Sequence, residues 1–362
     1  MQGITLSGRY LSSHDFVTGR AAEWMRTNHT PQAVADFLRH WFTTDEAVVA
    51  QTSGSTGPPK TIVLQRSQMI ASAQLTALHF GFKAGMRALL PLSADFIAGK
   101  MMLVRAIVSG LDLYVSSPTQ KVGELFPGTE FDFTPLVPAQ LYALLKGETP
   151  TSRMGTILLG GSDVSPELRQ MLPSMGQQEV WQGFGMTETV SHIALRRVQP
   201  GGEEAYLTLP GLLTEADANG QLRVWGAVTN YLWLQTKDEV VFDEPGRFRW
   251  LGRSDHVIVS AGHKLHPEML EQRLLDLMAQ NPQFAQLTAT DFYIAAAPDA
   301  KYGHIPILVV EKQHVIEEAL FEQFLHLEKA HLQSWELPRK IVAVDELERT
   351  ANGKLKRRLI FD

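Results

Sequence analysis

At 362 residues the chain is longer than a single hydrophobic core usually supports, so we expect at least two domains. Hydrophobic residues make up 44% of the sequence and charged residues 20%, a composition that excludes a disordered chain. The net charge of -6, from 33 basic and 39 acidic residues, provides no basic field for binding a polyanion, so we expect no nucleic-acid partner.

Cysteine is absent from the sequence, which excludes disulfides, cysteine-ligated zinc and a thioester on an enzyme thiol. Any thiol chemistry would therefore need a sulfur from outside. The N-terminus lacks the basic-then-apolar profile of a signal peptide, and Lys100 and Arg105 interrupt the most apolar helical stretch, 96–110. We expect a cytoplasmic protein without membrane insertion.

The first half of the chain alternates between predicted strands and helices. The apolar spacing of Val34, Phe37, Leu38 and Trp41 predicts an amphipathic helix after Thr30-Pro31. Next come a buried strand at 47–50, a glycine-rich loop at 53–57, a helix at 66–80, strands at 87–90, 111–115, 156–159 and 178–181, and helices at 97–109, 137–146 and 165–172. This rhythm predicts an α/β fold whose mostly parallel sheet is covered by helices.

Between about 193 and 250 the pattern changes to short β-rich runs, including 222–225 and 231–234, with Asn219-Gly220 as a turn signal. A compact αβ pattern then restarts, with strands at 256–260, 289–296, 306–310 and 340–344 and helices at 267–279 and 315–333. We therefore expect a large N-terminal domain over 1–254 that includes a β-subdomain, and a small αβ C-terminal domain over 255–362.

The most informative local pattern is Thr52-Ser53-Gly54-Ser55-Thr56-Gly57-Pro58-Pro59-Lys60. Glycines let backbone N–H groups approach phosphate oxygens, hydroxyls add donors and Lys60 supplies a cation, so the composition suits a polyphosphate. It is not a Walker loop, because Pro59 stands where that motif requires glycine. A plain flexible loop is the alternative interpretation.

A second pattern follows the strand predicted at 178–181 and reads Gly185-Met186-Thr187-Glu188-Thr189. A carboxylate beside hydroxyls at the end of a strand can hold Mg²⁺, which neutralises phosphate charge. An exposed glutamate in a turn is the competing interpretation.

A third pattern, Gly252-Arg253-Ser254-Asp255, precedes Ser260-Ala261-Gly262-His263. Arg253 offers a fork of donors for ribose or phosphate, and Gly262 lets the backbone pass close to a ligand. His263 and His266 are not spaced like a zinc pair on one helix face. The alternative here is a surface turn leading into a strand.

A fourth pattern is Asn352-Gly353-Lys354, a tight turn that would present Lys354 to an anionic centre. Its alternative is a solvated basic tail formed by Lys354, Lys356, Arg357 and Arg358.

Together and in this order, over roughly 52–358, the four patterns resemble the adenylate-forming superfamily of acyl-CoA synthetases, peptide synthetase adenylation domains and luciferases. The resemblance implies an AMP-forming acid:CoA ligase that uses ATP, Mg²⁺ and CoA. It assigns phosphate binding to 52–60, adenine contact to Gly160 and Gly161, α-phosphate contact to Thr187 and the Mg²⁺ to Glu188. It further assigns the ribose to Asp238 and Arg253, a hinge to Asp255, the thiol tunnel to Ser260, Ala261 and Gly262, and adenylation to Lys354.

The resemblance also implies that the C-terminal domain is mobile. Rotation about Asp255 would withdraw Lys354 after adenylation and bring Gly262 to the acyl-adenylate, so that one site runs two half-reactions. The missing cysteines agree with an external CoA thiol.

Within this superfamily the chain is most similar to the short o-succinylbenzoate:CoA ligases of menaquinone biosynthesis, judged from 185–194 and the Pro91-Leu92-Ser93 to Gly99-Lys100-Met101 segment. That acid carries two carboxylates, and Lys100 and Arg105 are the candidates for holding the one that is not activated. Both residues could instead be ordinary helix surface residues.

Three departures from the superfamily pattern bear on the substrate. The segment before Thr52 is short, so most of one subdomain should be missing; Lys237 replaces the usual glycine before Asp238; and Ser93-Ala94-Asp95-Phe96 replaces an aromatic-histidine pair. Another aryl or acyl acid:CoA ligase, a non-catalytic nucleotide-binding protein and an adenylation domain serving a carrier protein remain alternatives. The pattern does not predict an oligomeric state.

Overall fold

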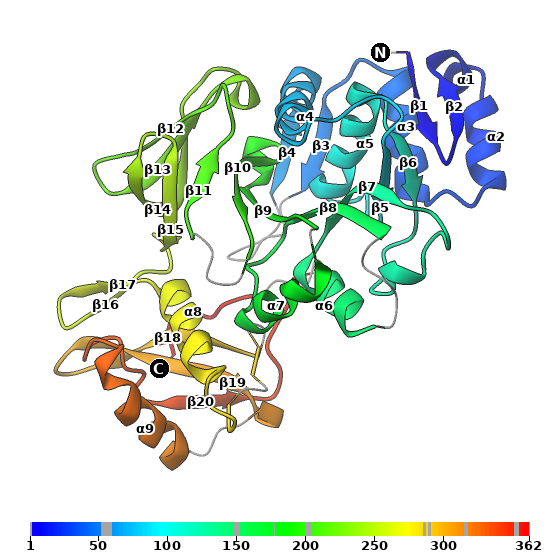
Figure 1. The fold of residues 1–362 in the computed structure, drawn as a ribbon. Coiled ribbons are helices and arrows are strands. Elements are labelled where there is room, and N and C mark those ends of the chain that lie inside the picture. Colours follow the sequence, from blue (N-terminus) through cyan, green and yellow to red (C-terminus); the bar gives the residue numbers. More distant parts are fainter. Residues whose placement is uncertain are drawn as a thin grey trace.

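A computed structural model of the chain describes residues 2–51, 60–147, 153–176, 178–199, 204–284, 287–288, 291–314, 318–350 and 355–361. The strands of these residues form a 13-stranded sheet, a five-stranded sheet and a two-stranded hairpin. Figure 1 shows the large sheet with its helices in one body and the five-stranded sheet with two helices in a smaller body beside it.

The large sheet contains β1 (Gly3–Leu6), β2 (Arg9–Ser12), β5 (Arg87–Leu90), β6 (Asp112–Val115), β7 (Phe131–Leu136), β8 (Met154–Leu159), β9 (Val180–Gly185), β10 (His192–Arg197), β11 (Tyr206–Thr208), β12 (Leu213–Ala216), β13 (Gln221–Trp225), β14 (Leu234–Glu244) and β15 (Arg247–Arg253). Its strand order is β12-β13-β14-β15-β11-β10-β9-β8-β7-β5-β6-β1-β2. Strands β1, β6, β5, β7, β8 and β9 pair in parallel, whereas the strands from β9 to β12 pair antiparallel. The mixed α/β architecture expected from the sequence is confirmed.

Helices cover both faces of the parallel half. Successive strand residues point to opposite faces, so Ala88 and Leu90 pack into one core cluster while Leu89 packs into another. The first cluster includes α4 (Arg66–Phe80) and α5 (Ile97–Ser109), and the second includes α6 (Pro138–Lys146) and α7 (Pro166–Met171). This double cover explains why these strands lack polar alternation.

The antiparallel half is the expected β-subdomain. The turn at Asn219-Gly220 is confirmed, because Gly220 has a φ of 83° and its N–H donates to the Asp217 carbonyl over 3.0 Å. The strand expected at 231–234 is wrong. Asn230 and Tyr231 have φ values of 52° and 58°, a left-handed conformation that no strand accommodates, and β14 begins only at Leu234.

The strand expected at 47–50 belongs to a hairpin outside the large sheet. Strand β3 (Val48–Gln51) pairs antiparallel with β4 (Thr61–Leu64). The facing side chains of Val49 and Val63 are 56% and 59% exposed, so the expectation of full burial was wrong for half of its residues. The two strands flank the glycine-rich loop.

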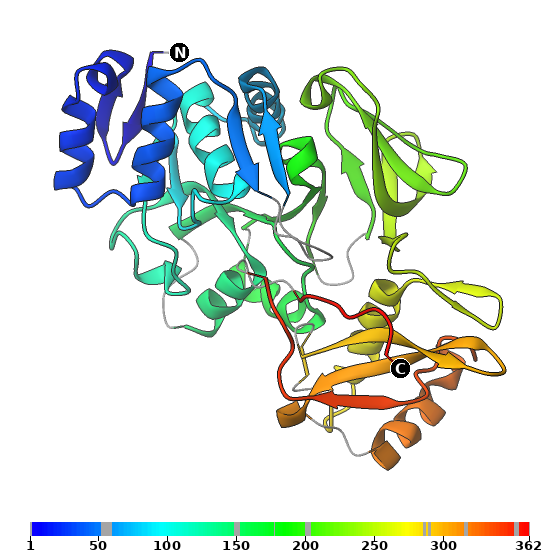
Figure 2. The same ribbon diagram turned by 180° about the vertical axis from the view of Figure 1, so that it is seen from behind.

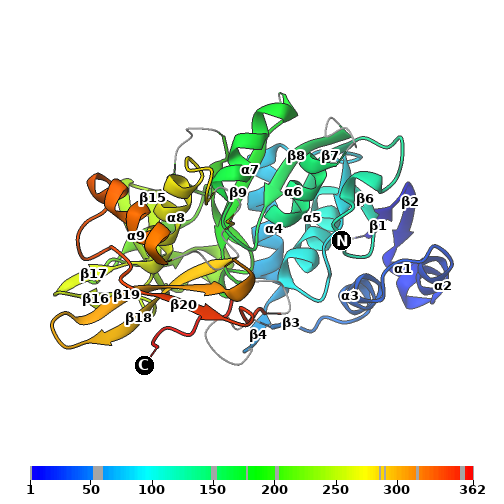
Figure 3. The same ribbon diagram turned by 90° about the horizontal axis from the view of Figure 1, so that it is seen from below.

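Before this hairpin lie three helices, α1 (Ser13–Val17), α2 (Arg20–Thr27) and α3 (Gln32–Thr43), of which only the last was predicted. Figure 3 shows them at the end of the molecule opposite the small sheet. Among the described residues, none of the helices has both the length and the hydropathy that crossing a bilayer requires.

The small sheet combines β16 (Ile258–Ser260), β17 (His263–Leu265), β18 (Phe292–Asp299), β19 (Gly303–Glu311) and β20 (Ile341–Val344). Two helices, α8 (Pro267–Met278) and α9 (Glu318–Leu327), cover it and share a separate core with it. Figure 2 shows this body from behind, with the red C-terminal segment running along it. The expected boundary at Asp255 falls between β15 and β16.

Candidate active site

Three of the expected nucleotide ligands lie at the carboxyl ends of neighbouring parallel strands. Gly160 and Gly161 directly follow β8, and Gly185 ends β9, which pairs with β8. Ligands of open α/β sheets bind at this edge. No side chain fits at Gly185, because a Cβ there would lie 2.2 Å from the Ser191 carbonyl oxygen.

The strands of the hairpin β3–β4 flank the predicted phosphate loop in the sequence. Residues 52–59, which include Thr52 to Gly57, lie outside the described residues, but Lys60 is described and lies exposed at the start of β4. Strand β4 contacts the 3-10 helix η4 (Thr187–Thr189), which carries the Thr187-Glu188 pair. The strand that follows the first motif in the sequence therefore lies against the element that carries the second motif.

Glu188 has the properties of a ligand held ready for a cation. It is half-buried on η4, and within the described part of the chain no hydrogen bond or ion pair engages its carboxylate. No described cluster of three or more acidic or histidine side chains could hold a metal by itself. Mg²⁺ commonly binds one carboxylate together with substrate phosphates, so Glu188, which has no partner among the described residues, fits this ion.

The two expected ribose ligands are cross-strand neighbours. Asp238 on β14 stands opposite Arg253 on β15, and Trp250 Nε1 donates to Asp238 Oδ1 over 3.0 Å. Burial raises the pKa of the Asp238 carboxyl, although Trp250 and Arg253 oppose that rise. A ribose diol would replace part of the lost hydration by donating hydrogen bonds to this carboxylate.

Asp255, the expected hinge residue, is tied to the large sheet. Arg253 donates to both of its oxygens, at 3.0 and 3.1 Å, and Lys237 Nζ lies 3.0 Å from Oδ2. Partial burial opposes ionisation, but these two cations outweigh it and lower the pKa of Asp255 to about 2. Lys237, which departs from the superfamily pattern, thus has a partner at the domain boundary.

The expected thiol-tunnel residues form the tip of the β16–β17 hairpin. Ser260 is buried and pairs with His263, while Ala261 and Gly262 at the turn have φ values of 52° and 80°. Two successive positive φ values define a tight hairpin turn, and alanine adopts this conformation only at a cost of about 1 kcal/mol. The Ala261 N–H donates to the Tyr302 carbonyl, which holds the tip against the small sheet.

Lys354 lies outside the described residues, but the chain on either side of it is anchored. Arg349 and Leu355 form a β-bridge, and Arg357 makes two hydrogen bonds to Glu271 of α8. Although burial disfavours its charge, Glu271 raises the pKa of Arg357. The alternative of a solvated basic tail is therefore wrong for Arg357, because its guanidinium packs against the Glu271 carboxylate and its side chain is only 15% exposed.

Arg105 is buried without any carboxylate partner among the described residues. Its side chain is 2% exposed and donates from Nε to Thr76 Oγ1 at 3.2 Å and from Nη2 to Ser191 Oγ at 2.6 Å. Burial lowers the pKa of its guanidinium to about 10. The surface-residue alternative is thus wrong for Arg105. Its partner Ser191 lies three positions after Glu188 in the sequence.

Lys100 behaves differently. Its ammonium donates to the carbonyls of Ala94 and Asp95, at 2.7 and 2.8 Å, and half-burial lowers its pKa. These bonds tie Lys100 to the segment before α5 and occupy two of the three N–H groups of its ammonium. The structure therefore gives Lys100 a local partner set and does not bring it to Arg105.

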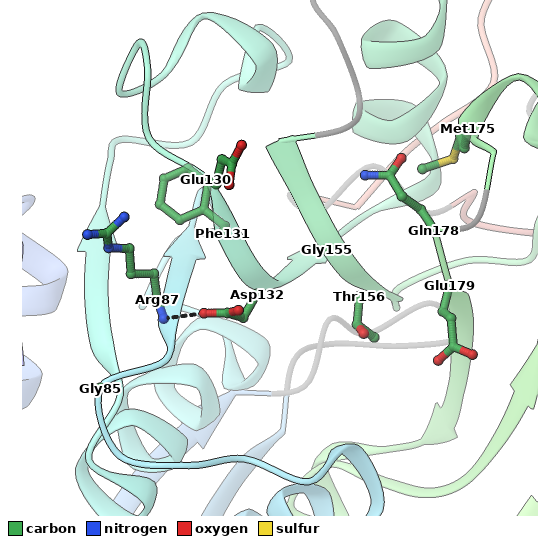
Figure 4. A pocket seen from close by; sticks show the side chains of 10 residues that line it. All are labelled: Gly85, Arg87, Glu130, Phe131, Asp132, Gly155, Thr156, Met175, Gln178 and Glu179. Carbon is green, nitrogen blue, oxygen red and sulfur yellow. Dashed lines mark hydrogen bonds between the residues drawn. The ribbon is translucent and has the colours of Figure 1, made fainter.

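A cavity of about 850 Å³ lies elsewhere, at the amino ends of β5, β7, β8 and β9 (Figure 4). Its lining includes Arg87, whose backbone N–H donates to Asp132. The described motif residues Gly160, Gly161 and Gly185 lie at the opposite, carboxyl ends of these strands. We therefore do not assign the nucleotide site to this cavity, despite its volume.

Sequence reasoning missed the residues around Arg105, namely Thr76, Ser191 and His192. Ser191 and His192 lie within 185–194, a segment that contributes to the family resemblance without pointing to a role for either residue. Thr76 lies on a helix predicted from its apolar spacing, which gives no signal for a polar role. Only the packing of α4 and β10 on α5 brings them together.

The model of the AMP-binding enzyme family matches residues 18–217. A 2-succinylbenzoate–CoA ligase of Listeria monocytogenes is 26% identical over 368 aligned residues, which cover 94% of this chain and 74% of that relative. An acyl-CoA synthetase (AMP-forming)/AMP-acid ligase II-like protein from Dyadobacter fermentans is 35% identical, with a TM-score of 0.60 over 91% of this chain and 93% of that one.

The fold is also similar to that of O-succinylbenzoate coenzyme A synthetase from Bacillus subtilis, solved in complex with ATP and magnesium ion. The TM-score is 0.74 at 23% identity, and the match covers 86% of this chain and 69% of that one. At this identity the likeness shows the fold alone.

Proposed function

This chain belongs to the AMP-binding enzyme family, and from that premise we propose that it converts o-succinylbenzoate into its CoA thioester. The reaction class is that of an AMP-forming acid:CoA ligase, as the family and the ligases similar to this chain show. The acid and the roles of individual residues are the proposal.

In the first half-reaction a carboxylate oxygen of the acid attacks the α-phosphorus of ATP, and pyrophosphate leaves with the bonding electrons. Thr187 would donate to an α-phosphate oxygen, and Lys354 would approach the same phosphate from the C-terminal domain. Both act where negative charge develops, so they stabilise the transition state more than bound ATP. A Mg²⁺ ion held by Glu188 would neutralise phosphate charge.

In the second half-reaction the CoA sulfur attacks the acyl carbon, the thiol loses its proton and AMP leaves with the former carboxylate oxygen. We assign thiol access to the hairpin tip formed by Ser260, Ala261 and Gly262. Rotation of the domain 255–362 about Asp255 would exchange this tip for Lys354. The contacts of Asp255 with Arg253 and Lys237 keep the pivot on the large sheet.

The observation that carries the choice of acid is the buried, uncompensated charge of Arg105. An isolated ion in a protein interior costs several kcal/mol unless a partner arrives. No described residue accepts from its Nη1, so two N–H groups remain for a ligand. A substrate with a second carboxylate supplies that partner, as o-succinylbenzoate does.

The test is incubation of the protein with ATP, Mg²⁺, CoA and single acids, followed by mass detection of the thioester. We expect o-succinylbenzoate to exceed 3-benzoylpropionate, the same acid without its ring carboxylate, by about 10²-fold in kcat/KM. Arg105→Ala should raise the KM for o-succinylbenzoate and spare the KM for ATP. Equal use of the two acids would favour another aryl or acyl acid:CoA ligase.

A non-catalytic nucleotide-binding protein is the remaining alternative. Lys354→Ala distinguishes it, because loss of pyrophosphate release with ATP binding retained requires a catalytic chain. Binding of ATP without turnover of any acid would support the alternative.

A further inference from the structure

Four polar side chains from three separate elements form a buried cluster around the Arg105 guanidinium. Thr76 comes from α4, Arg105 from α5, and His192 from the start of β10, with Ser191 immediately before it. Thr76 is 0% exposed, Arg105 2% and His192 8%, so water contributes little to their solvation. Their hydrogen bonds must therefore satisfy one another.

The contacts determine which nitrogen of His192 carries the proton. Arg105 Nη2 lies 3.5 Å from His192 Nδ1, and Ser191 Oγ lies 3.3 Å from the same atom. Because the guanidinium can only donate, Nδ1 must be the acceptor. The proton then sits on Nε2, which lies 3.2 Å from Thr76 Oγ1, and Thr76 donates in turn to the Ser72 carbonyl.

This arrangement leaves the cluster with a single positive charge. Burial lowers the pKa of His192 well below its usual range, and the nearby Arg105 and His79 lower it further, so the ring stays neutral. The other partners of Arg105 are hydroxyls. A carboxylate at any of these positions would have formed a buried ion pair like that of Arg357 with Glu271.

The backbone of β9 makes room for the histidine. A Cβ at Gly183 would meet His192 Cβ at 3.0 Å, and a Cβ at Gly185 would meet His192 Cα at 2.6 Å. These two glycines let β10 lie close to β9, which sets the imidazole beneath α4 and α5. The position of His192 thus depends on β9, the strand that leads into the 3-10 helix carrying Thr187 and Glu188.

We infer that His192, with Thr76, is a positioning residue that orients the Arg105 guanidinium and, being uncharged, reserves its charge for the second carboxylate of the acid. The inference rests on the proposed function, since it concerns how that carboxylate is selected. His192 itself does not touch the acid. By holding the Arg105 guanidinium in place without neutralising its charge, His192 makes the enzyme prefer a diacid over the matching monoacid.

Three substitutions at one position separate orientation from charge. In His192→Asn the amide oxygen can replace Nδ1 as acceptor, and we expect the KM for o-succinylbenzoate to stay within about threefold of the wild type. His192→Leu removes the acceptor and should raise that KM on the order of 10-fold or more. His192→Asp places a carboxylate against Arg105 and should bring the preference for o-succinylbenzoate over 3-benzoylpropionate close to parity.

Two measurements distinguish positioning from general damage. The KM for ATP and the kcat with 3-benzoylpropionate should be unchanged in all three variants, since neither depends on the second carboxylate. His79→Asn is the matched control, because His79 is a half-buried histidine that packs edge-to-face against Trp181 and has no hydrogen bond to Arg105 among the described contacts. It should keep the wild-type preference between the two acids.

The outcomes bear separately on the two proposals. If the wild type does not prefer the diacid, the proposed substrate is wrong. If the wild type prefers it and His192→Asp keeps that preference, the inference about His192 is overturned while the substrate stands. Should His192→Asp fail to fold, the pair His192→Asn and His192→Leu decides, and an equal KM for o-succinylbenzoate in both would overturn the inference.

Discussion

Two buried arginines of this chain differ in their partners, and the difference predicts unlike responses to replacement by methionine. Arg357 makes two hydrogen bonds to the Glu271 carboxylate, which also accepts from the Ile294 N–H. Removing Arg357 leaves Glu271 buried with an unpaired charge. Breaking a buried pair in this way typically costs about 3–5 kcal/mol, so Arg357→Met should lower the free energy of unfolding by that amount.

Arg105 has only neutral partners, and two effects of its loss oppose each other. Burial lowers its pKa from the ordinary arginine value to about 10, which at about 1.4 kcal/mol per tenfold change in proton affinity corresponds to roughly 3 kcal/mol of destabilisation. Because the folded state binds this proton less tightly, the penalty is complete below about pH 10. Arg105→Met removes the penalty and about three hydrogen bonds worth about 1 kcal/mol each, so stability should change by less than about 1 kcal/mol.

Urea unfolding at neutral pH, followed by far-ultraviolet circular dichroism, measures both effects. Lys356→Met is the control, because Lys356 makes only a half-exposed pair with Glu348 at 3.7 Å, which should be worth less than about 1 kcal/mol. A loss in Arg105→Met as large as that in Arg357→Met would refute the view that Arg105 is uncompensated. A loss in Arg357→Met no larger than that in the control would refute the value given to its ion pair.

Three further predictions concern the nucleotide site. Glu188→Gln should slow acid-dependent ATP–pyrophosphate exchange by about 10²–10³-fold while leaving ATP binding without Mg²⁺ intact, and unchanged exchange would remove Glu188 from the metal site. Burial raises the pKa of Asp238, so ATP affinity should fall as the pH drops through that raised value. Asp238→Asn should abolish this pH dependence. The same pH profile in the wild type and in Asp238→Asn would contradict the ribose assignment. Gly185→Ala should lower exchange at least about tenfold, because its Cβ would lie 2.2 Å from the Ser191 carbonyl oxygen, and full activity would contradict the close approach.

Much of the parallel half was predictable because its elements carry strong local signals. Strands β5, β6 and β8 and helices α4 to α7 lie within a few residues of their expected ranges. Strand β7 was missed because Pro135 interrupts a short run that also contains the polar residues Asp132 and Thr134. The proline is tolerated near the end of the strand, beyond the Ala88 to Phe133 pairing with β5.

The site was predictable only as separate motifs. The resemblance singled out Gly185, Asp238 and Arg253 one by one, and only the structure shows that Asp238 pairs with Arg253. The burial of Arg105 could not be inferred, because the same helical pattern suits a surface arginine. The Glu271–Arg357 pair joins residues 86 positions apart, and no local spacing reports such a contact.

The central claim is that the carboxylate of the acid attacks the α-phosphorus of ATP. The most direct measurement uses o-succinylbenzoate labelled with heavy oxygen in its side-chain carboxylate, incubated with the protein, ATP, Mg²⁺ and CoA, with mass analysis of the products. We expect AMP to carry one labelled oxygen and the thioester to retain the other. Labelled orthophosphate in place of labelled AMP, or AMP without label, would contradict it.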